Sequence, residues 1–123
     1  MDKIERSGKI KIRGFDPQYP GLVIVEIPLN EEPSAEWADC LRHPTTFTPG
    51  IHPPQVEGKA IVWRADKDLV DKDIKWVFSY IDQANACYEQ VLKEKKEERA
   101  RREQEAKKKE AELEQIQKKL ENL

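Results

Sequence analysis

The chain has no long hydrophobic run and few of the residues on which metal sites and disulfides depend. Its 123 residues include 2 cysteines, 2 histidines and 5 glycines. Two cysteines without a CxxC pair do not make a disulfide framework, so we expect Cys40 and Cys87 to be buried free thiols. No stretch reaches the ~18 apolar residues of a spanning helix, and residues 1–13 are too charged for a signal peptide. These absences favour a cytoplasmic protein without membrane contact.

The last third of the chain lacks glycine, proline and aromatic residues altogether. Between residues 93 and 112 the only uncharged residues are Ala100, Gln104, Ala106 and Ala111. Such a segment cannot bury a core, whereas its good helix formers and its oppositely charged pairs four residues apart favour an exposed helix. We therefore predict two domains. Residues 1–92 form a small globular head that includes the first half of a long helix, and residues 93–123 form a charged helical tail.

Apolar residues return only at the end of the tail, spaced three, four and three apart: Leu113, Ile116, Leu120 and Leu123. This seam covers two heptads, fewer than the three or four of a convincing coiled coil. We expect it to support weak association at most, either in a homodimer or with another protein. The composition suits a monomeric helix and one strand of a coiled coil equally well.

A strong excess of charge of one sign is also missing. The net charge is −2, with 11 basic and 15 acidic residues in the head and 11 basic and 9 acidic in the tail. This balance is unlike that of a dedicated nucleic-acid binder. The alternative of a nucleic-acid accessory factor rests on the basic clusters of the tail: Arg99, Arg101, Arg102, Lys107, Lys108 and Lys109. Each cluster is flanked by glutamate, which is more typical of a solvated helix surface.

The hydrophobic pattern of the head predicts an α+β fold. Alternating or β-branched runs predict three strands, at residues 9–13, 22–27 and 59–64. A fourth strand is proposed at 46–48, and residues 1–8 read as frayed. The sheet is expected to be antiparallel or mixed, with its helices on one face.

Two helices are predicted in the head. Over residues 34–42, Ser34 is the expected N-cap, and Trp37, Cys40 and Leu41 form one apolar face. The long helix is expected to open near Asp66 or Asp68, with Asp68 as its cap, and to continue beyond the head as a charged stalk.

The long connection from Pro44 to Gly58 is the favoured functional surface of the head, because long loops in small domains are often functional. Four of its residues are candidates for partner binding: Thr45, Phe47, His52 and Gln55. The competing interpretation is a proline-stiffened crossover with Phe47 and Ile51 packed in the core.

No motif for catalysis or for a cofactor is recognisable. The acidic run from Asp66 to Asp73 lacks the glycine and the final glutamate of an EF-hand loop. Cys40, His43, His52 and Cys87 include no second close-spaced pair to complete a zinc site. We therefore predict no cofactor and no enzymatic activity. The favoured function is a protein–protein interaction or adaptor module, in which the head binds a partner and the tail positions or weakly oligomerises it.

Overall fold

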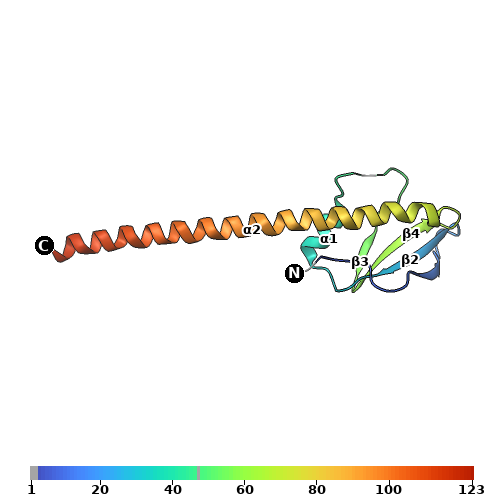
Figure 1. Ribbon diagram of the computed structural model, residues 1–123, viewed down its shortest axis with the longest axis horizontal. Coiled ribbons are helices and arrows are strands. Elements are labelled where there is room, and N and C mark those ends of the chain that lie inside the picture. The colour runs from blue at the N-terminus through green and yellow to red at the C-terminus, as the bar shows by residue number, and fades with distance from the viewer. Residues whose placement is uncertain (1–2, 47) are drawn as a thin grey trace. The chain divides into compact units, whose positions relative to one another are not determined.

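The computed structural model describes residues 3–46 and 48–123 (Figure 1). Its elements follow in the order β1 (Lys11–Phe15), β2 (Leu22–Pro28), α1 (Ala35–Arg42), β3 (Gln55–Glu57), β4 (Ala60–Asp66) and α2 (Val70–Glu121). The chain divides into two compact units, Met1–Glu89 and Gln90–Leu123. The predicted α+β class, with a short helix and one long C-terminal helix, is confirmed.

The sheet has four antiparallel strands in the order β1-β2-β4-β3. The fourth strand is β3, which lies at the end of the long loop and turns back into β4 through Gly58 at positive φ. The prediction of a strand at 46–48 is wrong for Thr46 and Thr48, which belong to no strand, and Phe47 lies outside the described residues. β3 was missed because it has only three residues, with Val56 as the single apolar one, and so short a segment shows no recognisable strand periodicity.

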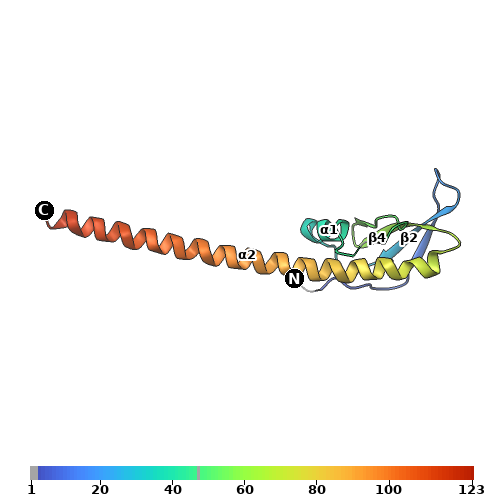
Figure 2. The same ribbon diagram turned by 90° about the horizontal axis from the view of Figure 1, so that it is seen from above.

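One face of the sheet forms the core. Along β2 buried residues alternate with half-buried ones, and the buried set of Val23, Val25 and Ile27 faces the same side as Ile61, Trp63 and Ala65 of β4. In Figures 1 and 2, α2 runs along the sheet as a separate layer. It contributes Val77, Tyr80, Ile81 and Ala84 to the core.

Helix α1 is capped as predicted, since the Ser34 hydroxyl accepts a hydrogen bond from the Trp37 N–H at 3.2 Å. Its predicted apolar face of Trp37, Cys40 and Leu41 is buried. The expectation of free thiols is wrong, because Cys40 is disulfide-bonded to Cys87 of α2. Both residues lie on helix faces that turn toward the core, which brings their Cα atoms to 5.8 Å, a normal separation for a disulfide.

The first residues of the head are ordered against the sheet, so the expectation that residues 1–8 fray is wrong for those described. Ile4 is buried, Arg6 forms a β-bridge with Leu29, and the Ser7 N–H donates to the Pro28 carbonyl at 2.8 Å. We call residues 3–7 the N-terminal strap. Its pairing partner lies more than twenty residues away, so local sequence gives no sign of it.

Asn85 is the buried polar centre that joins three parts of the head. Its Oδ1 accepts hydrogen bonds from the Ile4 N–H at 3.1 Å and from the Trp37 Nε1–H at 3.0 Å, and its Nδ2 donates to the Ile4 carbonyl at 2.8 Å. The strap, α1 and α2 are thereby fixed to one another. Because buried polar groups need partners, Asn85 selects this arrangement of the three segments.

Helix α2 begins at Val70, two to four residues after the predicted opening near Asp66 or Asp68. Residues 67–69 form a turn in which the Asp66 carboxylate accepts a hydrogen bond from the Asp68 N–H at 2.8 Å. Asp66 therefore makes the turn into the helix, and the expected cap at Asp68 is replaced by this arrangement. Asp71 and Asp73 lie in the first helical turn, where a negative charge favours the helix dipole.

Candidate functional site

The outermost strand, β1, pairs on one side only, with β2. Ile12 lies opposite Val25 and Phe15 opposite Val23, so both side chains point to the core side of the sheet. They nevertheless remain 55% and 66% exposed, whereas Val25 is fully buried. Together with Ile10, at 36% exposed, they make an apolar strip along the free edge, which we call the β1 edge.

A bulge in β1 lies between Ile12 and Phe15. The register shifts between Ile12 and Gly14, so that Arg13 has no direct opposite on β2. Gly14 takes φ +145°, a conformation that a side chain rarely adopts. The extra residue turns the Arg13 side chain to the face of the sheet that the helices leave open. Bulges on edge strands are usually specific features rather than defects.

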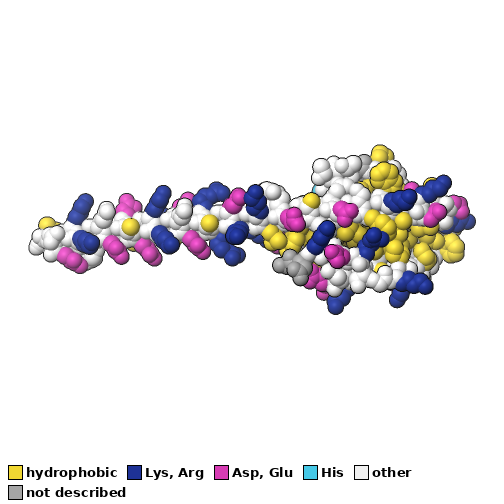
Figure 3. All heavy atoms as spheres, viewed as in Figure 1, with side chains coloured by type: hydrophobic (Ala, Val, Ile, Leu, Met, Phe, Trp, Pro, Cys, Tyr) yellow, Lys and Arg dark blue, Asp and Glu magenta, His cyan; other side chains and the backbone are white. Residues whose placement is uncertain are grey.

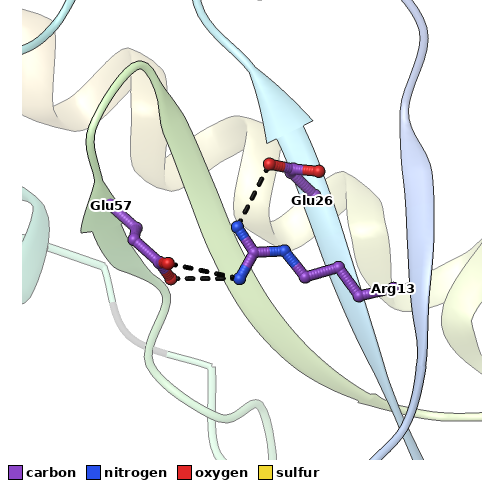
Figure 4. A network of polar contacts seen from close by, with 3 residues as sticks. All are labelled: Arg13, Glu26 and Glu57. Atoms are coloured by element: carbon purple, nitrogen blue, oxygen red, sulfur yellow. Dashed lines mark hydrogen bonds and ion pairs between the residues drawn. The ribbon is translucent and has the colours of Figure 1, made fainter.

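Arg13 reaches across that open face to the far side of the sheet (Figure 4). Its guanidinium lies 3.1 Å from Glu26 Oε1 on β2 and 3.2 Å from Glu57 Oε2 on β3. The hydrogen bond to Glu26, and secondly that to Glu57, raise the pKa of Arg13 above its ordinary value. One side chain from one edge strand thus connects to the opposite edge strand.

Around Arg13 the open face forms a shallow hollow of about 460 Å³. It is lined by residues of all four strands and of the loop before β3, among them Ile24, Val62, Arg64, His52 and Gln55. Arg64 forms an ion pair with the buried carboxylate of Asp16 at 3.0 Å. Both arginines of the hollow are therefore matched by carboxylates, and the hollow carries no uncompensated arginine for an anionic ligand.

Of the four loop residues predicted to bind a partner, the structure brings two to the same hollow. His52 and Gln55 both line the open-face hollow, and Gln55 belongs to β3. Thr45 is exposed, but it is not among the residues that line this hollow, and Phe47 lies outside the described residues. Sequence reasoning missed Arg13, Glu26 and Glu57, because only the strand order brings these three residues together.

Much of the long loop is held in place by α2 and the core. The Thr46 N–H donates to Gln83 Oε1 at 2.8 Å, and the Thr48 N–H donates to the Tyr80 hydroxyl at 3.0 Å. Ile51 is 8% exposed, and Pro54 is buried. The interpretation of the loop as a packed crossover is therefore correct for Ile51.

Among residues 3–46 and 48–123 no group of three or more His, Cys, Asp or Glu residues has the geometry to hold a metal ion. Cys40 and Cys87 are bonded to each other, so neither offers a thiolate. Over the same residues, no helix is long and apolar enough to cross a membrane.

The tail is exposed along its whole length. Its space-filling surface carries side chains of both charges, with only a few hydrophobic ones between them (Figure 3). Leu113, Ile116 and Leu120 are 65%, 49% and 57% exposed, and Leu123 is 97% exposed. The first three share a helix face, as their spacing predicts.

Comparison with protein families, with curated proteins and with solved structures finds no match. The function must therefore be argued from the surfaces of this chain.

Proposed function

We propose that this protein is a non-enzymatic interaction module whose head binds an extended segment of another protein along the β1 edge. The observation that supports this is the exposure of Ile12 and Phe15 on a strand that pairs on one side only. An added strand would pair with the free backbone groups of β1, and its side chains would cover both residues. Peptides commonly bind to other domains in this way.

The exposed apolar side chains make the edge unusual for a protein that remains monomeric. Proteins generally protect such edges with charges, bulges or short strands. The β1 edge has a bulge, and Lys9 and Lys11 alternate with its isoleucines, yet it retains Ile10, Ile12 and Phe15 on one side. Full burial of an Ile or Phe side chain contributes about 1.5–3 kcal/mol, so covering these partly exposed side chains is a useful source of affinity.

The tail would provide a second contact through Leu113, Ile116, Leu120 and Leu123, and would position the head relative to its partner. We propose a cytoplasmic location on the basis of the amino-acid composition. The Cys40–Cys87 disulfide bears on it, because disulfides are uncommon in reducing compartments. The redox state of this pair in the cell is therefore the measurement that tests the location.

The test is a selection of random peptides on the full-length protein, followed by binding measurements on the selected sequences. We expect Ile12→Thr with Phe15→Thr to weaken binding at least about tenfold, since two apolar contacts are removed. Leu69→Thr is the matched control, because Leu69 is 44% exposed but lies outside β1 and should leave binding unchanged.

A test of backbone pairing distinguishes strand addition at the β1 edge more sharply than the loss of the Ile12 and Phe15 side chains does. In an added strand only alternate residues direct their N–H groups toward β1, so of two peptides N-methylated at the two alternate sets, one should fail to bind and the other should still bind. Hydrogen exchange of the amides in residues 11–15 should slow on binding. Selected peptides that tolerate both the Thr substitutions and N-methylation at each of the two sets would refute the β1 edge as the site.

The nucleic-acid alternative receives less support. The six basic residues that suggested it follow the helix around its circumference rather than along one face, and Arg102 is paired with Glu98 at 2.7 Å. An accessory factor of this kind should bind duplex or single-stranded nucleic acid with an affinity that falls steeply with salt. If the protein does not bind nucleic acid even at low salt, this alternative function is excluded.

A further inference from the structure

One face of the tail is basic over about four helical turns. Because α2 is an unbroken helix from Val70 to Glu121, residues at about 100° intervals can be placed around its axis. Toward the N-terminus from Leu113, in steps of four and three residues, the same helix face holds Lys109, Ala106, Arg102, Arg99 and Lys95. Four of these five residues are basic. We call Lys95, Arg99, Arg102 and Lys109 the basic strip.

No glutamate lies on this strip. The seven glutamates between residues 93 and 112 occupy the flanks and the remaining circumference: Glu94, Glu97, Glu98, Glu103, Glu105, Glu110 and Glu112. Glu98 is at the border, where it pairs with Arg102. Lys95, Arg99 and Arg102 line one shallow hollow with Glu98, so the basic side chains are neighbours on the helix surface.

The same face continues into the apolar seam. Leu113, Ile116 and Leu120 follow the basic strip without a break in the helix. A partner that covers this face therefore meets a basic segment first and an apolar one after it. The two segments together restrict which partner fits.

A second copy of this chain fits poorly. A parallel homodimer would set each strip against an identical strip, and like charges across a seam oppose association. An antiparallel homodimer avoids this contact, but any overlap longer than residues 113–123, about three helical turns, sets the basic strip of each chain against the apolar seam of the other. Neither arrangement gives the basic strip an acidic counterpart.

A nucleic acid or an anionic lipid surface fits only part of the face. The strip would favour phosphate, but the glutamates on the rest of the helix oppose a polyanion, and the apolar seam has no counterpart on a nucleic acid. The seam is also much shorter than the apolar face of a typical interfacial helix.

We propose that the tail pairs with a helix of a different protein, one that carries acidic side chains opposite the basic strip and apolar side chains opposite Leu113, Ile116 and Leu120. This pairing rests on the proposed interaction function, but it concerns another surface than the β1 edge. Charged seam positions select partners in coiled coils in this way.

The test uses the full-length protein and two synthetic helical peptides designed to lie parallel to the tail. Both carry leucine opposite the apolar seam. One has glutamate opposite the basic strip, and the other has lysine at the same positions. We expect the glutamate peptide to bind at least about tenfold more tightly than the lysine peptide, with the difference shrinking as salt is raised.

A charge-reversed tail provides the reciprocal measurement. Lys95→Glu, Arg99→Glu, Arg102→Glu and Lys109→Glu together should invert the preference between the peptides, while circular dichroism checks that the helix persists. A matched control reverses four basic residues away from the strip, namely Lys93, Arg101, Lys107 and Lys108, and should keep the original preference.

Three outcomes would overturn the proposal. They are equal affinity for both peptides, no binding of the glutamate peptide, or self-association of the full chain tighter than its binding of that peptide. Comparable binding to nucleic acid or to anionic phospholipid vesicles at physiological salt would also overturn it. Ile12→Thr with Phe15→Thr should not affect the peptide preference, so failure of the tail pairing and failure of the β1 edge are distinguishable.

Discussion

Replacing Asn85 with alanine should be among the most destabilising single changes in the head. The substitution leaves two buried donors without a protein acceptor, the Ile4 N–H and the Trp37 Nε1–H, and it also deprives the Ile4 carbonyl of its donor. An unsatisfied buried polar group costs about 1–3 kcal/mol. The free energy of unfolding should therefore fall by about 2–5 kcal/mol, a large part of the 5–15 kcal/mol typical of a small domain.

Asn30, which follows β2, offers a matched control because it hydrogen-bonds to the same strap. It accepts from the Glu5 N–H at 2.9 Å and donates to the Lys3 carbonyl at 3.1 Å, the same kind of hydrogen bonds as those of Asn85, but at the surface. Water can replace these bonds, so Asn30→Ala should cost less than about 1 kcal/mol. The difference between the two variants in the free energy of unfolding therefore measures the effect of burial.

The assay is denaturant unfolding followed by tryptophan fluorescence. All three tryptophans lie in the head and the tail has no aromatic residue, so melting of the tail does not contribute to the signal. A double-mutant cycle with Trp37→Phe, which removes the indole donor, should show positive coupling to Asn85→Ala. An Asn85→Ala variant within about 0.5 kcal/mol of the parent protein, or equal costs at Asn85 and Asn30, would refute the reasoning.

Two further predictions concern the backbone. Reduction of the disulfide, or Cys40→Ala with Cys87→Ala, should lower the free energy of unfolding by about 4 kcal/mol, the loop-closure value for a sequence separation of 47 residues. The double variant should then be insensitive to reductant, and an unchanged parent protein under reductant would contradict the prediction. Gly14→Ala should cost about 1–3 kcal/mol because of its positive φ, whereas Gly21→Ala, with open space and no positive φ, should be nearly neutral. Equal effects at both glycines in thermal unfolding would show that the bulge does not need a glycine.

Local pattern was enough to predict most of the secondary structure. β2 and β4 were predicted within two residues of their ends, and the Ser34 cap and the buried face of α1 are as expected. These features depend on neighbouring residues: alternation with a period of two, apolar spacing of three and four, and one capping hydroxyl. The charged composition of the tail likewise required a helix without a core, since it has almost nothing apolar to bury.

Tertiary structure decided what lies side by side. The Ile4–Asn85 hydrogen bonds join residues 81 apart in sequence, the disulfide joins residues 47 apart, and the Arg13–Glu57 contact spans 44. No local period specifies such pairs, because they depend on strand order and on how α2 crosses the sheet. The same dependence explains why the short strand β3, whose pairing comes from β4, escaped sequence analysis. The free β1 edge follows from that strand order too, whereas the basic strip of the tail needs only an unbroken helix and the sequence itself.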